Sequence, residues 1–321
     1  MIPFKKRYAS IVLAATFAFS SAGLVVLPTS TVFAADASGA TATISDIIKN
    51  QQADGGWRKD YKVTSGDWAK STIDNKATYT EIRRLAAEYQ KTKDSKYSAA
   101  AVKGIQFLLN MQYANGGWPQ IYQSTGYHQH ITYNDDAMIN VMILLDEVAG
   151  KKGNFSFISS SLADKSKNAV AKGVQCLLKT QVVVNGKLTA WGQQHDSATL
   201  KPAGARAYEV PSLCAKESVG IIQSLKTRPS TPQIAASVQA AVDWLGAVKM
   251  KGIKVVKTSD DVVVVSDPNA APIWARFYEM GTNKPIFVGR DGVVKYQLRE
   301  IEQERRTGYS WYGTWPSSLV K

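Results

Sequence analysis

Two loops of the sequence carry neighbouring Asp and Asn residues directly before a segment with helical spacing. They are Asp74-Asn75 and Asn134-Asp135-Asp136. One such side chain is enough to cap a helix and complement its dipole. The others leave spare oxygen atoms, and calcium takes six to eight oxygen ligands in proteins. Capping and a shared cation site both stay open, because neither loop has the spacing of an EF-hand.

Three arginines lie in segments that would hold a side chain in place. Arg206 follows a Pro-Ala-Gly-Ala stretch, Arg276 lies among aromatic residues, and Arg290 sits in a Gly-Arg-Asp-Gly turn. An arginine framed in this way is often positioned to bind a carboxylate or phosphate with two N–H groups. The alternative is a purely structural ion pair, which Arg290 could form with Asp291.

The elements that must position these loops are mostly helices. Apolar residues recur at helical spacing in seven segments. The expected helices are Thr80–Lys91, Ala99–Met111, Asp136–Val148, Leu162–Thr180, Ser212–Leu225, Ile234–Val248 and Val294–Arg306. The strongest strand signals are Ile253–Lys257 and Val262–Val265, which a Ser-Asp-Asp turn joins into a small β-hairpin.

A weak repeat indicates how the helices are arranged. Gln51 to Trp57 and Met111 to Trp118 share a Gln…Gly-Gly-Trp pattern, and a blurred third copy runs from Thr180 to Gly192. Each copy follows a helix that ends in Gln, as in helical hairpins repeated round a ring. We therefore expect a mainly α fold, an α/α toroid or partial barrel of helical hairpins. We interpret the tryptophans as structural rather than as sugar-stacking platforms, although Trp57 and Trp118 could border a cleft.

The N-terminus has the pattern of a secretory signal. Lys5, Lys6 and Arg7 precede an apolar stretch, and Val32-Phe33-Ala34 ends in small residues that suit cleavage. We expect a signal peptide at residues 1–34, one catalytic domain at residues 35–321 and a secreted protein. A membrane anchor is the alternative, but no basic cluster follows the apolar stretch. No later segment approaches the ~20 apolar residues that span a bilayer, so no membrane association is expected after cleavage.

The bulk charge and the cysteines narrow the function classes. The chain of 321 residues has a formal net charge of +13, which favours an anionic partner. Acidic polysaccharide, nucleic acid and anionic envelope polymers all fit that charge. Cys176 and Cys214 are the two cysteines, and we expect buried thiols rather than a disulfide. With no CxxC pair, a thiolate zinc site is not expected.

Together, the motifs resemble those of polysaccharide lyase family 10 pectate lyases, in the same order from about Asp46 to Trp315. The stretches that carry the resemblance are Ile73-Asp74-Asn75, Asn115 to Gln120, Ile131 to Met138, Gln193 to Asp196, Ala205 to Glu209, Trp274 to Glu279, Gly289 to Gly292 and Gly308 to Tyr312. The resemblance implies an α/α toroid, polygalacturonate as the substrate and calcium as the cofactor. A monomer without nucleic-acid binding is expected.

Position by position, the resemblance also implies roles. Arg206 corresponds to the catalytic base, and Asp135, with Asp74 and Asp136, to the metal site. The residues expected to bind substrate are Arg276, Arg290, Asn75 and Tyr208.

The implied reaction is a β-elimination. It removes the proton at C5 of a galacturonate and expels the oxygen at C4, and cations bound to the carboxylate offset the charge that develops. Guanidinium has a reference pKa of about 12.5–13.8, so a base at Arg206 implies an alkaline optimum.

Two other functions are compatible with the same residues. A glycoside hydrolase would use paired carboxylates as acid and base, with Asp74 and Asp135 as candidates. A non-catalytic binder of anionic wall polymer would need only the basic charge and the tryptophans. A terpenoid-cyclase-like toroid is disfavoured because the sequence has no Asp-rich diphosphate motif. Nucleic-acid binding has only the net charge in its favour.

Overall fold

The structure is a computed structural model that describes residues 36–320. The expected signal peptide at residues 1–34 lies outside the described residues and stays a prediction. Within the described range, no helix has the length and apolar character needed to cross a bilayer. Cys176 and Cys214 are buried free thiols, as expected.

Eight α-helices occur in the described part of the chain. They are α1 (Ile44–Asn50), α2 (Tyr79–Thr92), α3 (Ser95–Met111), α4 (Ala137–Ala149), α5 (Ser160–Thr180), α6 (Ala215–Lys226), α7 (Pro232–Ala247) and α8 (Gln303–Thr307). The helices expected between residues 80 and 248 are confirmed, with ends that differ by a few residues. Helix α1 is not among the seven expected ranges, although the repeat implies a helix that ends at Gln51; Thr43 caps α1 through a capping box with Asp46.

The expectation of one helix over Val294–Arg306 is wrong. Val294 and Lys295 instead form a strand, and only Gln303–Thr307 is α-helical. Gln297 between them is extended (φ −131°, ψ 137°). The apolar residues that gave a helical pattern are buried by strand pairing and loop packing, so tertiary contacts override the local periodicity.

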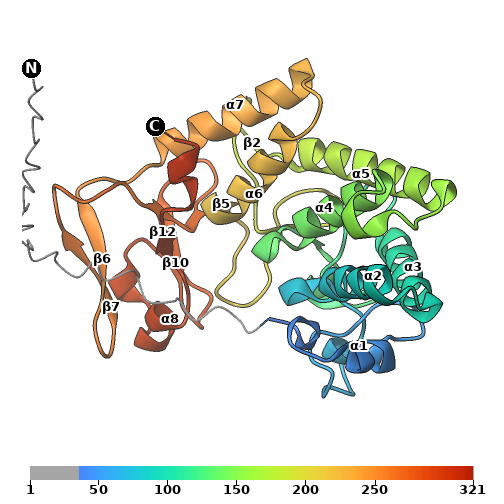
Figure 1. The fold of residues 1–321 in the computed structure, drawn as a ribbon. Helices are drawn as coiled ribbons and strands as arrows, with labels where there is room; N and C mark the ends of the chain where they lie inside the picture. Colours follow the sequence, from blue (N-terminus) through green and yellow to red (C-terminus); the bar gives the residue numbers. More distant parts are fainter. Residues whose placement is uncertain (1–35, 321) are drawn as a thin grey trace, which may run out of the picture. The chain divides into compact units, whose positions relative to one another are not determined.

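Six helices form three sequential pairs, α2–α3, α4–α5 and α6–α7 (Figure 1). The members of each pair pack on each other and are joined by short connections. Alternate helices then form two rows: α2, α4 and α6 contact one another in order, and α3, α5 and α7 do the same. These rows are the two layers of a partial α/α toroid, so the predicted fold class is confirmed.

Twelve short strands occur among residues 36–320; those before residue 215 lie in the loops that join one helix pair to the next, and the others follow α7. They are β1 (Ile131–Thr132), β2 (Val183–Val184), β3 (Lys187–Leu188), β4 (Gln194–His195), β5 (Leu213–Cys214), β6 (Ile253–Lys257), β7 (Val262–Ser266), β8 (Trp274–Ala275), β9 (Phe277–Tyr278), β10 (Pro285–Val288), β11 (Val294–Lys295) and β12 (Tyr312–Gly313). The expected hairpin is confirmed as β6 and β7. Pairing of β1 with β4, and of β5 with β9 in the four-stranded sheet β11-β10-β9-β5, brings successive loops together.

The repeated tryptophans are part of the scaffold. Trp57, Trp118 and Trp191 are fully buried, so none of them borders a cleft. Each indole N–H donates to a backbone carbonyl in the preceding helix, which is α1, α3 or α5. The acceptors are Ile47, Leu108 and Leu177, at 2.7–2.8 Å. The structural interpretation of the repeat is therefore confirmed, and the indole satisfies its polar group within the core.

The glutamine that begins each repeat joins two helix pairs. Its side-chain amide donates to one carbonyl in its own loop and to another in a later helix. The pairs of acceptors are Gly55 and Ala100 for Gln51, Gly116 and Ala169 for Gln112, and Thr189 and Ser237 for Gln181, at 2.8–2.9 Å. These contacts anchor the three loops at equivalent places, so residues after them emerge at the same end of the helical layers.

The packing of the second copy of the repeat, Met111 to Trp118, leads to a prediction about the free energy of unfolding. Gly116 has φ +94°, and a Cβ there would overlap the carbonyl oxygen of Lys172 in α5. Gly126 also has a positive φ, +62°, but open space around its Cβ position. We expect Gly126→Ala to cost about 1–2 kcal/mol from backbone conformation alone. Gly116→Ala should lose about 1–3 kcal/mol more by overpacking.

Urea unfolding of the two variants measures the difference directly. Equal losses for Gly116→Ala and Gly126→Ala would contradict close packing of this loop against α5.

Candidate active site

The predicted functional loops meet in a cavity of about 550 Å³ at the N-terminal ends of α4 and α6. Its walls combine oxygen-bearing side chains with several cations and two tyrosines. The lining residues are Asp36, Asn75, Lys76, Asn134, Asp135, Asp136, Arg206, Tyr208, Lys216, Arg276, Arg305, Gly308, Tyr309 and Ser310. Six of the eight predicted site residues are among them; Asp74 and Arg290 are not.

Asp74 is turned away from the cavity. Its side chain is buried, and each oxygen has a partner: Lys59 Nζ at 2.9 Å from Oδ2, and Gln120 Nε2 at 2.9 Å from Oδ1. Asp74 could reach a metal only by giving up one of these partners. In this structure Asp74 does not line the cavity, whereas its neighbour Asn75 does.

Arg290 does not line the cavity, but it is linked through Glu304 to Arg305, which does. Its guanidinium forms two hydrogen bonds with Glu304, at 2.8 and 3.1 Å. Glu304 is shared with Arg305, whose guanidinium carbon lies 4.6 Å from the ring centre of Tyr208. Arg290 therefore pairs with Glu304, rather than with its neighbour Asp291, and it is Arg305 that reaches the cavity wall.

The Asp and Asn residues before α2 and α4 do not act as helix caps. Asp136 is the N-cap of α4 and Thr78 is the N-cap of α2, but neither makes a side-chain cap hydrogen bond. Asn75, Asp135 and Asp136 have left-handed backbones, with φ values of 45°, 50° and 58°. Such conformations cost free energy and cluster at functional sites. Asp136 therefore gives α4 no side-chain cap, and Thr78 rather than Asp74 or Asn75 is the N-cap of α2.

A buried carboxylate organises the wall beside Asp135. Glu217, in the first turn of α6, accepts from Arg276 Nη2 at 2.6 Å and from Lys216 Nζ at 3.1 Å. Its other oxygen contacts the thiol of Cys214. Burial acts to raise the pKa of Glu217, but Arg276 and Lys216 outweigh it and hold that pKa at about 2.

The two cations held by Glu217 also face Asp135. Lys216 Nζ is 3.0 Å from Asp135 Oδ1, and Arg276 Nη2 is 3.9 Å from the same oxygen. Burial opposes the charge on each cation, but the neighbouring carboxylates raise both pKa values. Arg276 and Lys216 are therefore fixed positive charges beside Asp135.

A second carboxylate, Glu209, holds Arg206. Arg206 donates from Nε at 2.7 Å and from Nη2 at 2.5 Å to the two oxygens of Glu209. The hydroxyl of Tyr309 donates to Glu209 at 2.8 Å, and the Arg206 guanidinium carbon lies 4.9 Å from the ring centre of Tyr208. Burial acts to lower the pKa of Arg206, but its hydrogen bonds with Glu209 outweigh burial and raise it.

Asp136 differs from Asp135 in lacking partners. Among residues 36–320, no hydrogen-bond donor or cation contacts its carboxylate. Burial and the charges of Glu217 and Asp135 raise the pKa of Asp136 to about 6, although Lys216 and Arg276 act to lower it. Gly220 of α6 has no side chain, and a Cβ there would overlap an Asp136 oxygen. A partly buried carboxylate without a partner favours a cation, because desolvated charge must be compensated.

The oxygen atoms of the cavity suit a hard cation. Asp135 and Asp136 offer carboxylates, and Asn75 and Asn134 carry amide oxygens, which are the ligand types that calcium prefers. The amide oxygen of Asn134 also accepts from Gln193 Nε2 at 2.5 Å. The described residues contain no cluster of three His, Cys, Asp or Glu with metal-site geometry. The fit therefore rests on two carboxylates supplemented by amide oxygens, and a bound substrate or water would have to complete the ligand set.

Sequence reasoning assigned no role to Lys216, Glu217, Glu209, Tyr309 or Arg305. One signal was available for Lys216: a lysine in the first turn of a helix is disfavoured by the helix dipole, so its presence there indicates another role. Glu209 follows Arg206 by three residues, but only the structure shows that they pair. Glu217 could not be identified, because its partner Arg276 is 59 residues away in the sequence.

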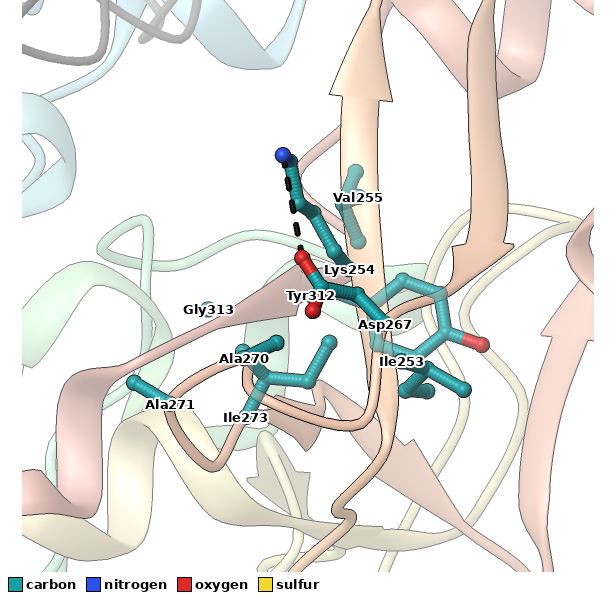
Figure 2. Close-up of a pocket in the computed structure, with 9 residues that line it drawn as sticks. All are labelled: Ile253, Lys254, Val255, Asp267, Ala270, Ala271, Ile273, Tyr312 and Gly313. Carbon is teal, nitrogen blue, oxygen red and sulfur yellow. Dashed lines mark ion pairs between the residues drawn. The ribbon is translucent and has the colours of Figure 1, made fainter.

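A second hollow beside β6 has different chemistry (Figure 2). It measures about 290 Å³ and is lined mainly by aliphatic residues, with the ring of Tyr312 at one side. Its two charged groups, Lys254 Nζ and Asp267 Oδ2, face each other at 3.8 Å. None of the predicted site residues lies there, so the cavity at α4 and α6 is the candidate active site.

The chain is similar to known proteins over most of its length. The family model described as pectic acid lyase matches residues 42–320. A family 10 polysaccharide lyase from Cellvibrio cellulosa is 36% identical, with a TM-score of 0.79 over 88% of this chain and 90% of the other. An aspartate-to-alanine mutant of a family 10 lyase from that organism, in complex with trigalacturonic acid, gives the same identity, TM-score and coverage of this chain, and 91% of its own.

A search of the curated proteins found no match. The family model spans nearly all the described residues, and the solved structures share more than a third of their sequence with this chain. The chain therefore belongs to the pectic acid lyase family.

Proposed function

We propose that this pectate lyase cleaves α-1,4-linked polygalacturonate by calcium-dependent β-elimination and leaves a 4,5-unsaturated sugar at the new chain end. The observation that carries the proposal is that Arg206, Arg276 and Lys216 line one cavity together with Asp135, which faces Lys216 and Arg276. A chain of uronates presents one carboxylate per sugar, which matches this density of cations. The complex of a 36% identical relative with trigalacturonic acid supports the same class of ligand.

Calcium would be held by Asp135 and Asp136, with amide oxygens from Asn75 and Asn134. When bound, it supplies positive charge that stabilises the carboxylate of the substrate as the C5 proton is removed. Asp74 remains a predicted ligand, but its contacts with Lys59 and Gln120 favour a positioning role.

Arg276 binds and orients a substrate carboxylate. Its guanidinium is fixed by Glu217 at Nη2 and lies 4.7 Å from the ring centre of Tyr309. A cation held in place before the reaction stabilises developing charge without reorganising. Tyr208, beside Arg206, lines the same cavity and contributes a surface for the sugar ring. Arg290, through Glu304, orients Arg305 at the edge.

Arg206 is the proposed base. In its neutral form it takes the proton from C5; the electron pair left on carbon forms the C4=C5 double bond, and the bond from C4 to its oxygen breaks. Solvent protonates the leaving oxygen. Glu209 accepts from two of the three guanidinium nitrogens, Nε and Nη2, and so fixes Arg206 at the cavity wall. The charge of Glu209 also favours the protonated form of Arg206. The reaction therefore needs alkaline conditions.

The hydrolase alternative has less support. It would require two carboxylates on either side of the scissile bond, and Asp74 is engaged by Lys59 and Gln120 rather than facing Asp135. We also propose that the protein is secreted, because Lys5, Lys6 and Arg7 precede an apolar stretch ending at Ala34. A monomer remains our expectation.

Product formation tests the function. Polygalacturonate treated with the purified protein at alkaline pH and with calcium should give fragments that absorb in the near ultraviolet, because the new double bond is conjugated with the carboxylate. Addition of a chelator should abolish this signal, and restored calcium should recover it. Chain cleavage without the absorbance, or equal rates after removal of the metal, would refute the proposal.

Replacement of Arg206 tests its role as base. Arg206→Ala should lower kcat by about 10²–10⁴-fold, the range that general-base catalysis contributes. Binding of trigalacturonate, measured by calorimetry, should fall far less, because Arg276 and Lys216 remain. A variant that keeps more than a tenth of wild-type kcat would point to another base.

Replacement of Glu209 tests how Arg206 loses its proton. The carboxylate raises the pKa of Arg206, so Glu209→Gln should lower that pKa. The rising limb of the pH dependence of kcat should then move to lower pH, even if the maximum rate falls.

The matched control is Glu147→Gln. Glu147 forms the same two hydrogen bonds with Arg83, at 3.0 and 3.1 Å, outside the cavity. In Glu147→Gln, the rising limb of the pH dependence of kcat should lie at the same pH as in wild type. If this limb does not move in Glu209→Gln either, ionisation of Arg206 does not set the pH dependence.

A further inference from the structure

We propose that Lys216 is an internal cation that competes with calcium for Asp135, and that it passes to a substrate carboxylate when the metal binds. Lys216 would thereby weaken calcium binding in the free enzyme and couple it to substrate binding. The inference rests on the proposed function and concerns the same cavity.

Lys216 occupies the oxygen that a metal would use. Its ammonium lies 3.0 Å from Asp135 Oδ1, and its side chain is 14% exposed at the cavity wall. Arg276 Nη2 is 3.9 Å from the same oxygen. The other oxygen of Asp135, Oδ2, accepts from Asn134 Nδ2 at 3.2 Å. A calcium ion that binds Asp135 through Oδ1 therefore replaces Lys216 there and approaches two fixed positive charges.

The ammonium of Lys216 stays beside the metal site even after it loses its contact with Asp135. Its second partner is Glu217, at 3.1 Å, which is 1% exposed. Without Lys216, this buried carboxylate would keep only Arg276 and the thiol of Cys214, and an incompletely paired buried charge is costly. Glu217 therefore retains the ammonium beside the metal site.

Helix stability does not explain a lysine at this position. Lys216 is the second residue of α6, where the helix dipole disfavours a cation. An ammonium group has three N–H donors. If Asp135 turns to the metal and Glu217 keeps one donor, the others are available to a uronate carboxylate next to Arg276.

The coupling follows from linkage. Free calcium must overcome repulsion by Lys216, whereas a substrate carboxylate that binds Lys216 reduces that repulsion. Calcium and uronate should each increase the affinity of the other by the same factor. Part of this factor should disappear when Lys216 loses its charge.

The test is calcium binding, measured by titration calorimetry on the metal-free protein without substrate. Lys216→Gln removes the charge and can still donate to Glu217. We expect it to bind calcium about tenfold more tightly than wild type, which corresponds to about 1.4 kcal/mol. Structural damage would weaken binding, so the direction separates the two explanations.

Two further variants act as controls. Lys216→Arg keeps the charge and should keep the weak calcium affinity. Lys70→Gln removes a lysine that is paired with Asp67 at 2.9 Å, outside the cavity, and should leave calcium affinity unchanged. Thermal unfolding with chelator present establishes that each variant is folded. If Lys216→Gln does not fold, Lys216→Met replaces it.

A second calcium titration with trigalacturonate present measures the coupling between calcium and uronate binding. The wild-type protein by itself shows whether this coupling exists. We expect trigalacturonate to tighten calcium binding in wild type and to do so less in Lys216→Gln. Unchanged or weaker calcium binding by the folded variant, or no coupling in wild type, would overturn the role of Lys216. If wild type binds no calcium under either condition, this inference and the calcium requirement both fail, whereas ultraviolet-absorbing product still tests the elimination itself.

Discussion

The site depends on the compensation of one buried charge. Glu217 lies in the first turn of α6 with almost no exposure, so it must be paired with cations to stay ionised. Its partners come from two directions: Lys216 from the same helix turn and Arg276 from the loop after α7. Both cations then face Asp135, which precedes α4. One carboxylate thus fixes three parts of the chain and sets the charge that a substrate meets.

The helical layers make this meeting possible. Helices α1, α3 and α5 each lead into a loop that a glutamine and a buried tryptophan hold in the same way, as Gln112 and Trp118 show. Such anchors place successive loops at one end of the layers, where scaffold-supported loops commonly carry function. Asn75 and Asp135, which have left-handed backbones, follow the first and the second of these anchors. The rigid scaffold therefore sustains local strain in the loops that carry the chemistry.

Helical periodicity predicted the helices between residues 80 and 248, because each buries one apolar face throughout its length. It failed over Val294–Arg306, where strand pairing buries the same residues. Motif resemblance placed most site residues in the right cavity, but it could not give side-chain directions. Asp74 and Arg290 point to partners far away in the sequence, and Lys216 acquires its role from a carboxylate and a helix end that only the fold brings together.

The central claim is that fixed cations at this cavity make a ring hydrogen of a uronate removable. The most direct measurement uses a galacturonate oligomer deuterated at C5 and follows the isotope by mass spectrometry. The account predicts that the fragment with the new non-reducing end has lost the deuterium of its first sugar, and that cleavage is slower than with the ordinary oligomer. Fragments that keep this deuterium at every cleaved sugar would contradict it.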